Sequence, residues 1–386
     1  MTMSLRRGIA VATLAAQLGG PIGGGIAFAD RPDDGARDTA TPIKHVIVII
    51  GENRTFDNLY GTYVPRPGQH VLNLLSQGIV KPDGSPGRNM HAAEQFQIAT
   101  INPVSYFIST KSLSNPSKTP YAPFLPTPEA GGAPPRAVTL DQLDGDPAPA
   151  APPFDAHTFS RDRLATLSPE IARKDLALFD VLIGTGGDWY CDICNSFQYA
   201  SSIMGDPAQR ATHIKDAADF FEALEHGGSL SAVSYLKPDS FGDGHPASSK
   251  ASLLEALIER VVDGLKARPE LFEHTALFIT FDEGGGYWDS GSFVPLDFFG
   301  DGPRIPMIVV SKYSRGGRVV HSYADHASVL KFIERNWRLK PLTSRSRDNL
   351  PNPVPTARNP YVPLNMPAIS DLFDMFDFGD AHDRDD

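Results

Sequence analysis

The feature that most constrains the fold of this chain is a strand of the buried type that ends in two acids and three glycines. Residues 276–281 are apolar and β-prone, and Asp282, Glu283 and the all-glycine residues 284–286 follow directly. Adjacent carboxylates at the end of a buried strand are costly unless their charges meet a partner. Ligands bind at the carboxyl ends of strands in an open α/β sheet, and a metal ion would supply the missing charge. The pattern therefore predicts an α/β sheet with a cation site at one edge.

A second run near the amino terminus repeats this design. Residues 44–50 form a near-continuous apolar strand that ends at Gly51, and Glu52 and Asn53 follow. Carboxylate and amide oxygens suit hard or borderline divalent cations such as Mg²⁺, Ca²⁺, Mn²⁺ or Zn²⁺. Two such strand ends side by side are expected to hold one ion between them, whose identity the sequence leaves open.

Regular elements alternate along the second half of the chain. Strands alternating with helices predict a mostly parallel central sheet flanked by helices. Helices are expected over residues 208–226, 248–267 and 325–337, and strands over residues 230–236, 277–281 and 305–310.

The predicted domain organisation is simple. Residues 30–378 are expected to form one domain, because the 386-residue chain is long enough to bury a substantial core. Within it, residues 64–155 are rich in proline and glycine and are expected to form a long irregular excursion that wraps the core. Residues 379–386 are expected to be a disordered acidic tail.

The first residues resemble a signal peptide. In residues 1–29, Arg6 and Arg7 precede a short apolar stretch, and residues 27–29 form a small-x-small cleavage site. A disordered amino terminus is the alternative interpretation. We expect export to the periplasm or the extracellular space, and the apolar stretch is too short to span a bilayer.

The net charge of the chain argues against nucleic acid as a non-specific partner. The formal net charge is −11, and without residues 1–29, which hold two arginines and no acid, 33 basic against 46 acidic residues give −13. A chain this acidic is not expected to bind nucleic acid non-specifically. An anionic substrate stays compatible with it, because a bound cation reverses the local field.

The only two cysteines are Cys191 and Cys194, separated by two residues. A lone pair cannot build a four-ligand zinc site unaided. In an exported chain a short-loop disulfide is the favoured interpretation, and a redox dithiol is the lesser alternative.

Three further polar clusters follow strands or open a helix, at residues 239–246, 284–289 and 322–328. Histidines beside acids in such clusters supply metal ligands or hydrogen bonds to phosphate. Each candidate also has a plainer interpretation. Their joint occurrence at one predicted sheet edge favours a ligand site. The plainer interpretations are a simple turn at Asp243 with His245 exposed, an N-cap at Asp325 with His326 in the first turn, a surface acid at Asp289, a helix start at Glu52 and Asn53, and a structural ion pair at Asp282 and Glu283.

Taken together, residues 47–57, 243–246 and 280–287 resemble the bacterial phosphoesterase family. That family includes enzymes of the phospholipase C and acid phosphatase types, with an alkaline-phosphatase-like α/β fold. The resemblance implies a divalent metal ion held by Glu52, Asn53, Asp282 and Glu283. It also implies a phosphate site to which Asn53, Asp243, His245 and His326 contribute, with the two histidines in catalytic roles.

The chain departs from the family where the nucleophile is expected. The family attacks phosphorus with a Ser or Thr hydroxyl in a loop flanked by Gly or Pro, and the chain is shortened there. Residues 184–186 are the only remnant, so Thr185 is the one candidate nucleophile, and a structural glycine turn is the alternative. The predicted function is an exported metal-dependent hydrolase of phosphoric esters that forms a phosphothreonine. A degenerate member that binds metal or phosphate without turnover is the rival hypothesis.

The substrate class stays open between soluble phosphate esters and phospholipids, and so does the oligomeric state. The aromatic residues Tyr287, Trp288, Phe298 and Phe299 either touch a membrane surface as a peripheral contact or pack within their loops.

Overall fold

The computed structural model describes residues 39–96, 105–107, 206–215, 217–238, 242–245, 249, 251–285, 287–291, 301–356 and 361–379. Several predictions lie outside these residues and stay predictions. They concern the signal peptide at 1–29, Thr185, Cys191 and Cys194, Phe298 and Phe299, and residues 380–386 of the tail.

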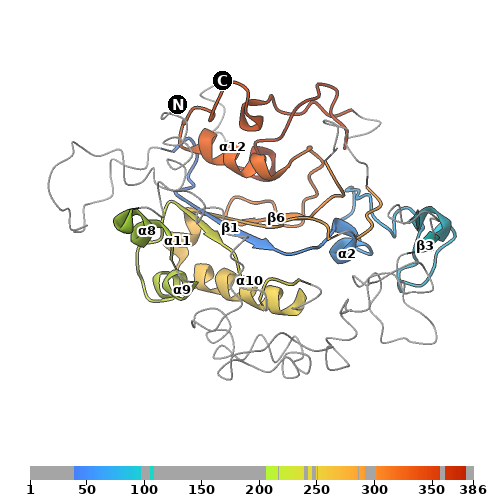
Figure 1. Ribbon diagram of the computed structural model, residues 1–386, viewed down its shortest axis with the longest axis horizontal. Helices are drawn as coiled ribbons and strands as arrows, with labels where there is room; N and C mark the ends of the chain where they lie inside the picture. The colour runs from blue at the N-terminus through green and yellow to red at the C-terminus, as the bar shows by residue number, and fades with distance from the viewer. Residues whose placement is uncertain are drawn as a thin grey trace.

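A four-stranded sheet forms the centre of the molecule (Figure 1). Its order is β4 (Val233–Leu236), β1 (His45–Gly51), β5 (Thr275–Phe281) and β6 (Met307–Ser311). The first three strands are parallel, which confirms the predicted α/β class with a mostly parallel sheet. β6 is antiparallel to β5. The described residues between β5 and β6 contain no crossover helix, so β6 returns directly beside its neighbour.

The helices and strands lie close to their predicted positions, and three differences are notable. The helix expected over 208–226 is two helices, over residues 207–213 and 217–225. The helix at 269–273 was not predicted, and the last strand starts at Met307 because Pro306 has no N–H for the ladder. The helices are α2 (Phe56–Tyr60), α8 (Pro207–His213), α9 (Ala217–Glu225), α10 (Ala251–Lys266), α11 (Pro269–Glu273) and α12 (His326–Asn336). Three 3₁₀ turns, η1 (Met90–Ala93), η5 (Arg347–Asn349) and η6 (Phe373–Met375), and a two-stranded ribbon of β2 (Glu94–Phe96) and β3 (Ser105–Phe107) complete the described elements.

Helices cover both faces of the sheet (Figure 1). On one face Ile47 and Ile279 pack under α9 and α10, and on the other Val48 and Phe278 pack under α12. Successive side chains of a strand point to opposite faces, so a strand covered on both sides is apolar throughout. This is why β1 and β5 read as unbroken hydrophobic runs.

The carboxyl-terminal segment closes the α12 face with aromatic rings. The ring of Phe332 on α12 lies 5.1 Å from Phe278, 5.0 Å from Phe373 and 5.2 Å from Phe376, measured between centroids. Phe332 is fully buried. Residues near the end of the described chain are therefore part of the core.

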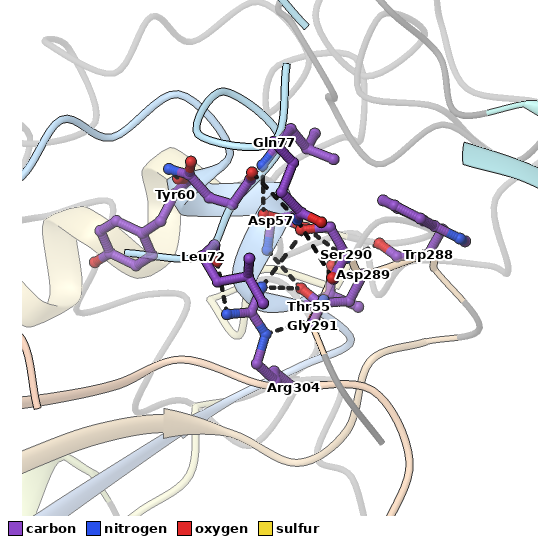
Figure 2. A network of polar contacts seen from close by, with 12 residues as sticks. Thr55, Asp57, Tyr60, Leu72, Gln77, Trp288, Asp289, Ser290, Gly291 and Arg304 are labelled. Carbon is purple, nitrogen blue, oxygen red and sulfur yellow. Dashed lines mark hydrogen bonds and ion pairs between the residues drawn. The ribbon is translucent and has the colours of Figure 1, made fainter. Parts of the chain in front are cut away.

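A buried polar network anchors the loop after β5 (Figure 2). Arg304 donates from Nε to Oδ2 of Asp289 at 2.7 Å and from Nη1 to the carbonyl of Leu72 at 2.7 Å. Asp57 accepts the backbone N–H groups of Ser290 at 2.6 Å and Leu74 at 3.2 Å. Asp289 is only 6% exposed, so its prediction as a surface acid is wrong. Its charge is satisfied by an arginine 15 residues further along the chain.

The same network fixes the aromatic side chain in this loop. The Thr55 hydroxyl donates to the Trp288 carbonyl at 3.2 Å, and Gln77 donates to the carbonyl of Ser290 at 3.3 Å (Figure 2). The Trp288 side chain packs on a small second core of Leu74, Ile79, Val80 and Ala93. Trp288 therefore follows the loop-packing alternative. Within the described part of the chain, no helix has the length and apolar content needed to cross a bilayer.

We expect Phe332→Ala to destabilise the protein by about 3 to 5 kcal/mol, because the change empties the centre of the aromatic cluster. Urea unfolding measures the difference. Leu364→Ala is the matched control, because Leu364 is 70% exposed and its truncation should be near neutral. Equal effects of the two changes would contradict the packing described here.

The Asp57 network predicts a specific pH dependence of stability. Burial, and next the neighbouring Asp289 carboxylate, raise the pKa of Asp57 from 3.8 to about 7. The folded state then retains a proton that the unfolded state loses, so the stabilisation is complete below about pH 4 and is lost as pH rises through 7. Between about pH 5 and pH 7 the unfolding free energy should fall by about 1 kcal/mol per pH unit in wild type relative to Asp57→Asn.

Urea unfolding at several pH values tests this dependence. Asp263→Asn, at an exposed position in α10, should follow wild type at every pH. Parallel curves for wild type and Asp57→Asn would show that Asp57 keeps its charge in the folded state throughout this range.

Candidate active site

Three parallel strands deliver polar side chains to one edge of the sheet. Lys237 follows β4, Glu52 follows β1 and Asp282 follows β5, all at carboxyl ends that pair in register. α12 starts at the same edge, because Nε2 of His326 lies 2.9 Å from the carbonyl oxygen of Phe281, the last residue of β5. The structure thus gathers the strand-end candidates as the sequence predicted.

Backbone hydrogen bonds connect the loops that follow β1, β4 and β5. The N–H of Asp282 donates to the Gly51 carbonyl at 3.0 Å, and the N–H of Glu52 donates to the Asp243 carbonyl at 2.9 Å. Oδ1 of Asp282 accepts the N–H of Asn53 at 2.9 Å. The loops after β1, β4 and β5 are therefore one connected unit, and a shift in one moves the others.

Gly285 allows the loop after β5 to approach the loop after β1. A Cβ atom on Gly285 would lie 2.7 Å from Cβ of Asn53, and the φ angle of Gly285 is +63°. Asn53 itself has a φ of +58°. Only glycine combines this conformation with so close a contact, which explains part of the three-glycine run.

The edge carries more acid than base. Nζ of Lys237 lies 2.8 Å from Oε1 of Glu52 and 3.3 Å from Oδ2 of Asp243. Burial raises the pKa of Asp282, and the nearby Glu52 carboxylate raises it further. Burial also raises the pKa of Asp243, against the opposing effect of Lys237. The connected loops thus hold three carboxylates, of Glu52, Asp243 and Asp282, against two cationic side chains, of Lys237 and Arg54, so acidic groups are in excess.

This excess charge fits a cation beside Glu52 and Asp282. Two neighbouring carboxylates are a donor set that hard divalent ions take. The Asn53 side-chain amide, next to them in the chain, forms no hydrogen bond with a described residue. One carboxylate oxygen of Glu283, Oε2, already accepts the N–H of Gly285 at 2.7 Å. Among the described residues no group of three acidic, histidine or cysteine side chains is already arranged as a metal site.

Asp243 and His245 form a tight turn within the unit. Asp243 is 2% exposed, and its Oδ1 accepts the N–H of His245 at 2.8 Å. Burial lowers the pKa of His245, although the Glu52 and Asp282 carboxylates act in the opposite direction. The imidazole is therefore neutral near pH 7, with one nitrogen able to accept a proton. An exposed, simple turn, the plainer interpretation, does not describe this loop.

At the start of α12, Asp325 caps the helix and His326 lies at the edge of the sheet. Asp325 is the N-cap, as its plainer interpretation predicted, and its Oδ1 accepts the N–H of Ala327 at 2.9 Å. His326 is the first helical residue and is exposed. Because a carbonyl oxygen only accepts, Nε2 of His326 carries the proton that it donates to Phe281. His326 thus stands at the same sheet edge as Asp282.

Two cationic residues of this site were missed by the sequence analysis. Lys237 directly follows β4. The sequence analysis searched the residues after each strand for acids, and the same search for basic residues would have found it. Arg54 is 1% exposed, and its Nε donates to the Gly244 carbonyl at 3.0 Å. Burial lowers the pKa of Arg54 to about 10, and its Nη1 is buried without a hydrogen-bond partner. A buried guanidinium with an unused N–H favours an anionic ligand.

Comparison with known proteins gives a family match for the central part of the chain. Residues 184–340 match the model of the phosphoesterase family. This range begins one residue before Thr185 and contains His245, Asp282 and His326. Glu52 and Asn53 lie ahead of it.

Similar curated proteins are named as phospholipases C. The chain is 30% identical over 187 residues to the non-hemolytic phospholipase C of Burkholderia pseudomallei, which covers 40% of this chain and 26% of that protein. Phospholipase C A of Mycobacterium tuberculosis is 31% identical over 174 residues, covering 38% of this chain and 32% of that protein. Non-specific phospholipase C6 of Arabidopsis thaliana is 24% identical over 379 residues, covering 79% and 70%.

The matches to the two bacterial relatives span about a quarter to a third of those proteins' length. The family match covers the loop after β4, the acids after β5 and the start of α12. By this match and these relatives, residues 184–340 are similar to the phosphoesterase family, and part of the chain is similar to proteins named as phospholipases C.

Proposed function

We propose that this chain is an exported, divalent-metal-dependent hydrolase of phosphoric esters with an alkaline-phosphatase-like fold. The observation that carries the proposal is the composition of the connected strand-end unit. It brings the adjacent carboxylates of Glu52 and Asp282 together with the neutral imidazole of His245 and the buried, unpartnered N–H of Arg54. Hydrolysis of a phosphate ester requires carboxylates that bind a metal cation, and beside them hydrogen-bond donors that bind the phosphoryl anion.

The proposed binding step uses residues from all three strand ends. A phosphoryl group would lie against His245 and His326, with Asn53 and the Asp243 turn beside it. Arg54 Nη1 would donate to one of its oxygens, which removes the cost of the unused N–H. A divalent cation held by Glu52 and Asp282, with Asn53 and Glu283 as further donors, would neutralise phosphoryl charge and lower the pKa of the attacking hydroxyl.

The proposed chemical step uses Thr185 as the nucleophile. Its Oγ forms a bond to phosphorus while the ester P–O bond breaks, and the leaving oxygen takes a proton and departs as an alcohol. A water molecule then attacks the phosphothreonine, which restores the Thr185 hydroxyl and releases phosphate or a phosphorylated headgroup. The neutral imidazole of His245 is suited to accept the proton that the attacking oxygen loses.

The relatives guide the choice of substrate. Because they are named as phospholipases C, a phosphodiester of the phospholipid type is the first substrate to test, followed by phosphomonoesters. A binding protein without turnover, the rival hypothesis, gains no support from these relatives.

We expect Thr185→Ala to reduce the hydrolysis of p-nitrophenyl phosphocholine and p-nitrophenyl phosphate by about 10³-fold or more, because it removes the nucleophile. Release of p-nitrophenol with added Mn²⁺, Zn²⁺, Mg²⁺ or Ca²⁺ measures the effect. Thr212→Ala, at an exposed position in α8, is the control and should keep full activity. Full activity in Thr185→Ala would assign the nucleophile elsewhere. Inactive wild type that still binds metal would establish the rival hypothesis.

We expect Asp282→Asn to weaken binding of a divalent cation by at least about 100-fold, because it removes one of the two adjacent carboxylates. Isothermal titration of the metal-free protein with Mn²⁺ measures the affinity, and Glu52→Gln should behave alike. Asp263→Asn, far more exposed, is the control. Unchanged affinity in both site variants would place the cation outside this sheet edge.

A further inference from the structure

A basic hollow on the surface shares no residue with the candidate active site. It is lined by Arg66, Gln69, Arg315, Gly316, Arg318 and Val319 and has a volume of about 400 Å³. Its walls come from the segment after α2 and the turn after β6, which are some 250 residues apart in sequence. The three arginines give the hollow a positive charge in a chain whose formal net charge is −11.

The hollow is built by specific contacts between its two walls. Oε1 of Gln69 accepts the N–H of Val319 at 2.5 Å, and its Nε2 lies 3.4 Å from the carbonyl oxygen of Gly317. Gly317 has a φ of +73°, and a Cβ atom there would lie 2.6 Å from Nε of Arg66. The Arg66 guanidinium therefore rests on the bare backbone of Gly317. The contacts fix the two walls together and so bring the arginines to one place.

The charge of this hollow is only partly compensated inside the protein. Arg315 pairs with Asp377, at 2.6 Å between Nη2 and Oδ2. The side chains of Arg66 and Arg318 form no hydrogen bond or ion pair with any residue in the described ranges. Convergent guanidinium groups repel one another unless an anion lies between them, and their planar donors match phosphate oxygens.

Exposed apolar side chains stand beside the hollow. Val64 is 71% exposed and Tyr63 is 36% exposed, just ahead of Arg66 in the chain. Val64 thus adds exposed apolar surface close in sequence to Arg66. It suits the boundary of a bilayer, where apolar side chains enter the acyl region and cations meet headgroups.

We propose that this hollow binds the phosphate of an anionic phospholipid headgroup and thereby docks the protein on an acidic bilayer surface. Arg66 and Arg318 donate to the phosphate oxygens, and Val64 enters the headgroup boundary. This docking is separate from the proposed hydrolysis, because it uses none of the residues assigned to the strand-end unit.

Vesicle co-sedimentation of the full chain tests the docking without requiring turnover. The probes are vesicles of phosphatidylcholine with phosphatidylglycerol, vesicles of phosphatidylcholine alone, and inorganic phosphate as a soluble competitor. Each arginine near an anionic bilayer contributes about fivefold to binding, so the double variant Arg66→Gln with Arg318→Gln should bind the acidic vesicles about 25-fold more weakly. Hydrolysis of a soluble p-nitrophenyl ester should be unchanged in this variant.

The matched control carries the same charge change elsewhere. Lys340→Gln with Arg345→Gln alters two exposed residues outside the hollow and should keep at least most of the binding. Near-identical thermal unfolding of the two double variants excludes misfolding as the cause of a loss. Val64→Ser should weaken binding with the arginines intact.

Three results would overturn the proposal. The first is no binding of wild type to acidic vesicles. The second is an equal loss in the hollow variant and in the control, which would indicate a general effect of net charge. The third is binding of inorganic phosphate by the hollow with no vesicle binding, which would identify a free phosphate as the ligand. Loss of docking with soluble hydrolysis intact, or the reverse, separates this proposal from the proposed function.

Discussion

The rest of the structure depends on crowding negative charge at the carboxyl ends of three parallel strands. Register and backbone bonds force Glu52, Asp243 and Asp282 together, and the cost of that repulsion must be met locally. Lys237 meets part of it through contacts with two of the carboxylates. The remaining negative charge fits the proposed cation. A bound cation would turn a repulsive edge into one that attracts phosphate, so the charge imbalance and the proposed chemistry have the same origin.

Residues 52–57 contribute both to the candidate site and to the support of the loop after β5. Residues 52–54 supply the carboxylate, the left-handed asparagine and the buried arginine of the site, while Thr55 and Asp57 anchor the loop that follows β5. The anchoring matters because that loop begins with Asp282. A rigid base for the loop helps to keep Asp282 beside Glu52. The polar network of Figure 2 is thus a support for the site and takes no part in its chemistry.

The sequence was informative where burial alone decides structure. β1 and β5 were found because strands covered on both faces must be apolar throughout, and their acidic ends follow from the same pattern. Prediction from the sequence failed where the burial or direction of a segment depends on residues elsewhere in the chain. Asp289 was misjudged because its burial depends on Arg304, 15 residues further along the chain, and on the neighbouring Asp57. The antiparallel direction of β6 is likewise seen only in its pairing with β5. Arg54 was overlooked because only the fold shows that its charge is buried.

Arginines serve the two proposed anion sites in opposite ways. Arg54 is sealed from water and held by the Gly244 carbonyl, so its interaction with a phosphoryl group would be strong and little affected by salt. Arg66 and Arg318 are exposed, so their attraction for headgroups falls as ionic strength rises. A buried cation suits the recognition of one ester during reaction, whereas exposed cations suit reversible arrival at a charged surface. Because salt weakens the second interaction much more than the first, changes in ionic strength would separate the proposed docking from the proposed turnover.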